Sequence, residues 1–188
     1  MRKIKQNLIA VIATLAIAAT ATVAAAKTTG PETAGRQGVV EQVRHELATL
    51  PYYGVFDNLT YKVDESTVTL YGQVTRPTTR SDAARRVAKI PGIERVVNNI
   101  EVLPLSSFDD SIRLQTYRAV FSTAGLYRYG MSANPSIHII VNGGHVTLEG
   151  VVSSKMDKQL AYMAASGVFG TFSVTNNLQV ESEMNQDS

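Results

Sequence analysis

The three histidines are the side chains best suited to bind a metal, and their spacing does not form a site. His45 falls on an expected helix, His138 at an outward strand position and His145 in a hairpin turn. They follow no ligand spacing such as H-x-x-x-H, and the chain has no cysteine to complete a ligand set. We expect solvated surface histidines, with only an adventitious contact between His138 and His145 across the hairpin. We therefore predict no metal and no cofactor.

The other groups that could do chemistry are scattered along the chain. Serine and threonine are frequent, but the sequence contains neither a G-x-S-x-G nucleophile motif nor a phosphate-binding P-loop. The carboxylates are not spaced to form the cluster that an enzyme acting on an envelope polymer would need. We predict that the protein is not an enzyme.

One group of charges is concentrated, and it is basic. Five bases lie before and along an expected helix, with Asp82 as the only acid among them. Each base near a membrane surface contributes about 1 kcal/mol of attraction to anionic lipid head groups. A solvated helix face that keeps the domain soluble is the alternative. The five candidate lipid contacts are Arg76, Arg80, Arg85, Arg86 and Lys89.

The N-terminus has the pattern of a secretory signal peptide. A short basic start is followed by an uncharged apolar run over residues 8–19 and by three small residues that end at Ala26. This pattern predicts a signal peptide over 1–26, cleavage after Ala26, a flexible segment over 27–37 and export to the periplasm. Retention of the signal peptide as a membrane anchor is the alternative. A lipoprotein anchor is excluded because the chain has no cysteine.

Export also changes the charge of the protein. Without Arg2, Lys3 and Lys5, the chain has fifteen bases and sixteen acids, a net charge of about −1. Such a chain has no overall electrostatic attraction to nucleic acid, so we predict no nucleic-acid partner.

An internal repeat organises the rest of the chain. A shift of 78 residues places residues 68–74 on 146–152, and residues 96–100 on 174–178. Upstream the register slips by two residues, which indicates a short insertion in a loop of the second copy. Two copies at this period indicate tandem domains rather than a solenoid, since a unit of roughly 65–75 residues can bury its own modest core.

Hydrophobic periodicity predicts the same elements in each copy. A helix comes first, two alternating strands form a hairpin, and a second helix leads to a last strand that is parallel to its neighbour. The predicted fold is α+β, with two tandem αββαβ units that each pack a three-stranded mixed sheet on two helices. The expected elements are 39–48, 58–64, 67–74, 80–90 and 95–102 in the first unit, and 110–124, 136–142, 145–152, 157–167 and 173–180 in the second.

This pattern resembles the BON domain (bacterial OsmY and nodulation). The motif V-x-L-x-G-x-V, then a helix, then G-x-x-x-V-x-N-x-[IL] occurs twice within residues 39–181. The resemblance implies an OsmY-like periplasmic or envelope protein, which binds phospholipid surfaces or envelope proteins and supports envelope integrity or stress tolerance. We expect domains over 38–103 and 110–181, a linker over 104–109 and a tail over 182–188. The motif residues are Val68, Leu70, Gly72, Val74, Gly92, Val96, Asn98 and Ile100, and then Val146, Leu148, Gly150, Val152, Gly170, Val174, Asn176 and Leu178.

Six motif residues have predicted structural roles. The two asparagines share the inward face, where an unpartnered amide costs roughly 1–3 kcal/mol, so each should bond nearby backbone at the first helix or the strand turn. A ligand-contacting amide is the alternative. The strand glycines should let a helix approach, and the later glycines should cap the second helices. Asp109 or Asp110 should cap the first helix of the second unit. The six are Gly72, Gly92, Asn98, Gly150, Gly170 and Asn176.

The two copies differ most along the second helix. The shift replaces Asp82 by Leu160 and Arg85 by Met163, so a face that is charged in the first unit is apolar in the second. A helix that is apolar nearly all round is covered by something. We rank the first unit first as its cover, ahead of a membrane, a partner protein or a second copy. The candidate interaction surface is Leu160, Met163, Ala164, Phe169 and Phe172.

Two functions remain open from the sequence. The leading hypothesis is a non-enzymatic envelope protein that contacts phospholipid surfaces or envelope proteins through this apolar surface and the basic group. The alternative is a soluble periplasmic chaperone-like adaptor whose target is a protein.

Overall fold

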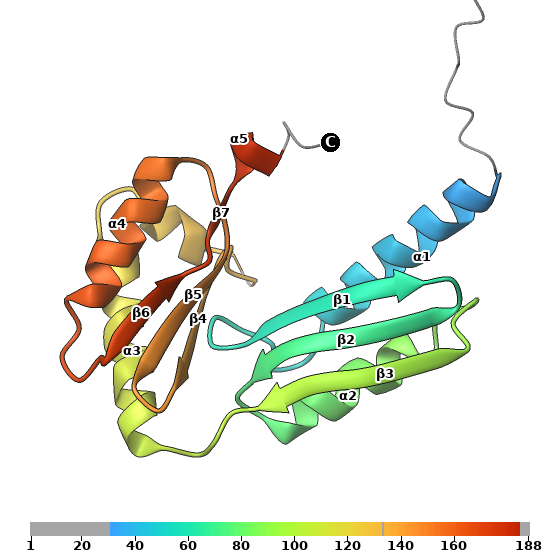
Figure 1. Ribbon diagram of the computed structural model, residues 1–188, viewed down its shortest axis with the longest axis horizontal. Coiled ribbons are helices and arrows are strands. Elements are labelled where there is room, and N and C mark those ends of the chain that lie inside the picture. Colours follow the sequence, from blue (N-terminus) through green and yellow to red (C-terminus); the bar gives the residue numbers. More distant parts are fainter. Residues whose placement is uncertain (1–30, 133, 185–188) are drawn as a thin grey trace, which may run out of the picture.

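The computed structural model describes residues 31–132 and 134–184, and the order helix, strand, strand, helix, strand occurs twice in them (Figure 1). The predicted signal peptide and its cleavage site after Ala26 lie outside these residues. The first unit consists of α1 (Pro31–Ala48), β1 (Asn58–Asp64), β2 (Thr67–Val74), α2 (Pro77–Val87) and β3 (Arg95–Val102). The second consists of α3 (Ser107–Ser122), the 3-10 turn η1 (Tyr127–Gly130), β4 (Ile137–Asn142), β5 (His145–Val152), α4 (Lys155–Ser166), β6 (Ser173–Asn176), β7 (Gln179–Val180) and α5 (Glu181–Met184).

Each unit is built around one central strand. In the first unit β2 pairs antiparallel with β1 and parallel with β3. In the second unit β5 pairs antiparallel with β4 and parallel with β6 and then β7. Strands β6 and β7 together correspond to the last strand of the unit, which is interrupted at residues 177–178. The predicted α+β fold of two αββαβ units with mixed sheets is confirmed.

Apolar side chains from both helices and the central strand fill each core. In the first unit, Val43 of α1 and Val87 of α2 are buried against Leu70 of β2. In the second unit, Ile112 of α3 and Ala161 of α4 are part of the corresponding core. One face of each sheet is thus covered by its own two helices.

The motif asparagines bond the second helix of their own unit. Asn98 Nδ2 donates to Arg80 O at 3.0 Å, and Asn176 Nδ2 donates to Lys158 O at 2.9 Å. Each amide oxygen also accepts a backbone N–H two residues further along its own strand. The partner is therefore the second helix, and neither the first helix nor the strand turn that the sequence had pointed to.

Several helix starts differ from the sequence expectation. Helix α1 begins at Pro31, eight residues before the predicted start, so most of the segment predicted to be flexible is helical. A proline in the first turn suits a helix start. The glycines that follow it interrupt the apolar periodicity from which the helix was predicted. Ser106 caps α3 by accepting from Asp109 N at 3.1 Å, so neither Asp109 nor Asp110 is the cap. Helix α4 likewise starts behind a serine cap, Ser154.

The prediction that Gly92 and Gly170 cap the second helices is wrong. Those helices end earlier, and their C-caps are Ala88 and Gly167, both in right-handed helical conformation. Gly92 and Gly170 have φ values of 90° and 87° and turn the chain toward the last strand.

The strand glycines also act differently from the prediction. Gly72 and Gly150 have φ values of 116° and 115°. A Cβ on Gly72 would lie 2.0 Å from Asn58 O, and a Cβ on Gly150 would lie 2.0 Å from Ser136 O. The close approach is thus made by the chain entering β1 or β4, and not by a helix. Only glycine fits both this backbone conformation and this contact.

A short segment of the first unit docks on the edge and outer face of β4. Ile139 N donates to Val55 O at 2.7 Å, and the ring of Tyr53 lies 5.5 Å from that of His138. Phe56 packs against the core of the second unit, with its ring 6.2 Å from that of Tyr117. Residues 53–56 therefore form the joint between the two units.

We predict that Gly150→Ala lowers the free energy of unfolding by about 3 kcal/mol or more, because it adds a steric clash to a strained backbone. Gly125→Ala is the matched control, since Gly125 also has positive φ (86°) but a Cβ there meets nothing within 4 Å. The control should cost only about 1–2 kcal/mol. Urea unfolding measures both, and equal losses would show that the contact with Ser136 contributes nothing.

Candidate functional site

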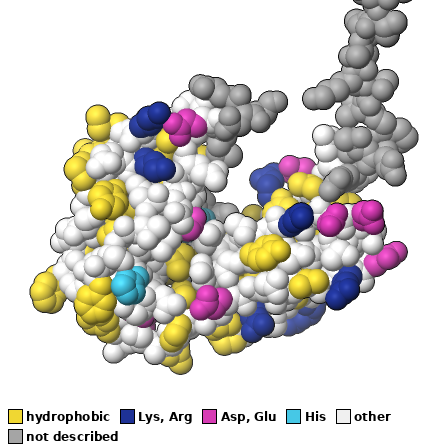
Figure 2. Space-filling view, in the orientation of Figure 1, with side chains coloured by type: hydrophobic (Ala, Val, Ile, Leu, Met, Phe, Trp, Pro, Cys, Tyr) yellow, Lys and Arg dark blue, Asp and Glu magenta, His cyan; other side chains and the backbone are white. Residues whose placement is uncertain are grey.

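Large exposed apolar side chains are unevenly divided between the units. Among the described residues, only Tyr52 and Tyr71 of the first unit belong to this class. The others lie in the second unit or just before it, and Figure 2 shows apolar atoms gathered along the end of the molecule that α3, α4 and β6 form. They are Leu105, Phe108, Leu114, Tyr117, Tyr127, Met131, Met156, Tyr162, Met163, Phe169 and Phe172.

Three phenylalanines at one end of the second unit form what we call the phenylalanine cap: Phe108, Phe169 and Phe172. Phe169 is 88% exposed, Phe172 is 70% exposed and Phe108 is 47% exposed. The rings of Phe108 and Phe172 lie 6.0 Å apart, and His145 stands edge-on to Phe172 at 5.9 Å. Exposed aromatic groups of this kind mark interaction surfaces more often than isolated apolar residues do.

Glycines form the floor of the cap. A Cβ on Gly144, in the β4–β5 turn, would lie 2.7 Å from the Phe172 ring and 3.2 Å from the Phe108 ring. The Phe108 ring also lies over Gly170, where a Cβ would be 3.4 Å away. The absence of side chains at these two positions lets the rings approach the backbone.

A buried carboxylate fixes the turn beneath the rings. Asp109 is 2% exposed, and its two oxygens accept from Gly143 N at 3.0 Å and Gly144 N at 2.8 Å. The first turn of α3 is therefore tied directly to the β4–β5 hairpin. Because Phe108 precedes Asp109 in the chain, the same contact positions its ring over the hairpin.

The corresponding end of the first unit is polar. The shift of 78 residues places Ser66 at the position of Gly144 and Glu94 at that of Phe172. Ser66 Oγ donates to Glu94 Oε2 at 3.2 Å, where the second unit has an aromatic ring on a glycine. The cap is thus a property of the second unit alone.

The structure divides the predicted apolar surface. Leu160 and Ala164 are partly buried against the core of their own unit, because they lie one turn apart on the inward side of α4. Met163, Phe169 and Phe172 remain exposed. The prediction that the first unit covers this surface is wrong, since the joint is made by residues 53–56 on β4.

Most of the predicted basic group is engaged inside the first unit. Arg76 stacks over the Tyr52 ring at 4.7 Å, and Arg85 pairs with Asp82 at 2.8 Å. Arg80 and Lys89 are exposed, and neither forms an ion pair within residues 31–132 and 134–184.

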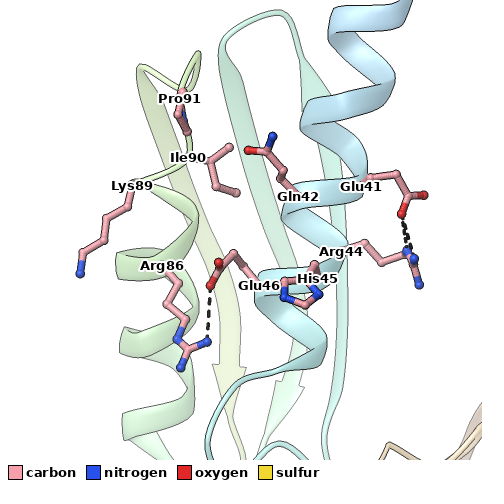
Figure 3. Close-up of a pocket in the computed structure, with 9 residues that line it drawn as sticks. All are labelled: Glu41, Gln42, Arg44, His45, Glu46, Arg86, Lys89, Ile90 and Pro91. Atoms are coloured by element: carbon pink, nitrogen blue, oxygen red, sulfur yellow. Dashed lines mark hydrogen bonds and ion pairs between the residues drawn. The ribbon is translucent and has the colours of Figure 1, made fainter.

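The fifth base closes a groove between α1 and α2 (Figure 3). Arg86 pairs with Glu46 across this groove of about 590 Å³ at 3.4 Å, and it also bonds Thr49. Lys89 points away from the groove, and Arg44 pairs with Glu41 along α1. Because Arg44 and Arg86 are paired with Glu41 and Glu46, we assign the groove to helix packing and not to ligand binding.

The histidines do not share a site. His145 is exposed and bonds Ser173 Oγ at 2.7 Å, whereas His138 is buried in the joint, so the expectation that His138 is solvated is wrong. In the strand register His138 faces Glu149, and it does not meet His145 across the hairpin as expected. Among the described residues, no group of three or more acidic or histidine side chains could hold a metal ion.

Sequence reasoning missed two residues of the site. The sequence predicts a linker at Phe108 and a helix cap at Asp109, because both residues stand just before an expected helix start. The sequence did carry a signal for Asp109, since the Asn142-Gly143-Gly144 turn leaves two backbone N–H groups in need of an acceptor.

Comparisons with known proteins support the repeat. The family model described as BON domain matches residues 37–104 and 127–182. Two solved structures of CdsD, a structural protein of the type III secretion system of Chlamydia trachomatis, are similar at 13% and 14% identity. They match 76% and 80% of this chain and 96% of their own, but a TM-score of 0.28 carries no argument. No curated protein matches.

We predict that Asp109→Ala lowers the free energy of unfolding by about 2 kcal/mol or more, because the N–H groups of Gly143 and of the buried Gly144 lose their acceptor. Hydrogen exchange at Gly143 and Gly144 should accelerate with it. Ser111→Ala, on the same helix, is the control and should leave both measurements near those of the unchanged protein. Unchanged exchange at the two glycines in Asp109→Ala would contradict the role of this carboxylate.

Proposed function

Since the chain belongs to the BON domain family and has two copies of the domain in tandem, we propose that it is a non-enzymatic protein that binds phospholipid membrane surfaces in the bacterial envelope. BON domains are binding domains that are associated with phospholipid and the envelope. The observation that carries the proposal is the phenylalanine cap. The predicted signal peptide supports a periplasmic location, and the family supports a role in envelope integrity.

The cap has the chemistry of a membrane-interface contact. Full burial of a phenylalanine side chain contributes about 1.5–3 kcal/mol, and Phe169 and Phe172 are the most exposed rings of the cap. Aromatic rings also favour the depth of the lipid head groups. Each helix within residues 31–132 and 134–184 is too short or too polar to cross a bilayer. We propose that the cap contacts the bilayer surface through these exposed side chains.

The first unit adds an electrostatic attraction to the membrane surface. Arg80 and Lys89 are exposed bases without an ion pair in the described residues, and each contributes about 1 kcal/mol near an anionic surface. Peripheral binding commonly needs two such signals together, one apolar and one electrostatic. Figure 2 shows some of the Lys and Arg atoms of the first unit along the lower rim of the molecule, where some apolar atoms of the second unit also lie.

We predict that the protein co-sediments with vesicles of phosphatidylethanolamine and anionic phosphatidylglycerol. The double substitution Phe169→Ser and Phe172→Ser should reduce the partition coefficient at least tenfold, because two rings no longer enter the interface. Met156→Ser is the matched control, since Met156 is 66% exposed but lies in the first turn of α4, away from the cap.

A separate variant tests the electrostatic contribution to membrane binding. Arg80→Gln with Lys89→Gln should weaken binding to anionic vesicles and leave binding to uncharged vesicles unchanged. Absence of binding to either vesicle at low salt would overturn the membrane proposal. If crosslinking then recovers one protein and the cap variant abolishes it, the cap serves the chaperone-like adaptor function instead.

A further inference from the structure

The joint between the units contains a buried histidine. His138 lies on β4 and is 7% exposed, with Nδ1 3.2 Å from Gly54 O and its ring beside Tyr53. Since a carbonyl oxygen only accepts, the closed joint holds a proton on Nδ1. In the first unit the corresponding residue is Thr60, which is exposed.

The docking segment around this histidine is itself held in place. Asp57 is 2% exposed, and its carboxylate accepts from Gly54 N at 3.2 Å and from Thr75 N at 2.6 Å. This arrangement fixes the turn that presents Gly54 O to His138 and Val55 O to Ile139. The joint therefore rests on two adjacent carbonyl groups of one turn.

The groups that face His138 come from both units. Burial lowers the pKa of His138, while the carbonyls of Gly54 and Asp57 and the carboxylates of Asp57 and Glu149 oppose this effect. Tyr53 adds no charge, because burial raises the pKa of its hydroxyl to about 12. The closed joint thus favours neutral His138, and this contribution is complete above the ordinary histidine value of about 6.5.

We propose that His138 is a proton-sensitive latch, and that its protonation releases residues 53–56 from β4 and loosens the two units. A second proton would place a charge in a buried, largely apolar joint, whereas an open joint hydrates it. Loosening would expose the outer face of β4, where Ile140 is 4% exposed in the closed form. This latch does not depend on the proposed membrane function.

The test measures the distance between the units as a function of pH. The chain has no cysteine, so Lys89→Cys and Gln159→Cys give one spin label on each unit, at exposed positions just after α2 and on α4. We expect a narrow distance distribution at pH 7.5 and a broad one at pH 5. One titrating group changes the ratio of closed to open forms by at most about tenfold for each pH unit.

The variants separate the latch from general acid effects. His138→Gln keeps an amide donor for Gly54 O but cannot be protonated, so its distance distribution should be the same at both pH values. His145→Gln is the matched control, since His145 is an exposed histidine of the same hairpin, and it should keep the full response. Circular dichroism of each variant confirms that both units stay folded.

Three results would overturn the latch. They are an unchanged distribution in the unsubstituted protein between pH 7.5 and 5, a response that persists in His138→Gln, and a response that disappears in His145→Gln. Hydrogen exchange at the Ile139 amide gives an independent measure, because its bond to Val55 O breaks when the joint opens. If His138→Gln fails to fold, the same exchange measured against pH in the unsubstituted protein decides the matter.

Discussion

The arrangement of the molecule depends on how the outer face of β4 is covered. An edge strand that packs on helices with one face normally alternates buried and exposed residues. In β4, however, residues 137–141 are all buried: Ile137, Ile139 and Val141 face their own helices, while His138 and Ile140 face away from them. Residues 53–56 of the first unit supply the missing cover and also accept the edge hydrogen bond of Ile139. The two units are thus packed against each other at the joint, where His138 is a polar residue among apolar side chains.

This cover decides which surfaces remain free. Because the first unit packs on β4, it cannot also cover α4, and the phenylalanine cap at the end of the second unit stays exposed. Arg80 of α2 and Lys89 just after this helix also stay exposed on the first unit. The joint therefore creates a division of roles, in which the first unit provides charge and cover and the second provides apolar contact.

The sequence predicts the strands almost to the residue, because alternation and the repeated motif both report on local pairing. It predicts helix ends less well, since caps such as Ser106 are set by single side chains. It places His138 on the outward side of its strand correctly, yet misses that this side is buried. The cover comes from a segment about 80 residues earlier, and no local pattern encodes a contact of that kind. The sequence predicts Phe169 and Phe172 as part of the apolar surface but not Phe108. The rings of Phe108 and Phe172 meet over Gly144 in the β4–β5 turn, and this contact between separate elements also has no local pattern.

Comparison of the copies separates residues that make the fold from residues that make the surface. Asn98 and Asn176 bond the carbonyl 18 residues before them in both units, and Gly72 and Gly150 have the same φ within a degree. These positions are the same in both units because the asparagines bond backbone carbonyl groups and the glycines let the backbone approach closely, and every copy of the fold needs both contacts. At the surface the copies diverge, and three of the changes that form the cap and the joint replace a polar residue of the first unit: Ser66 by Gly144, Glu94 by Phe172 and Thr60 by His138. Since these changes leave the shared backbone contacts intact, the second unit could acquire a cap and a joint without a new fold.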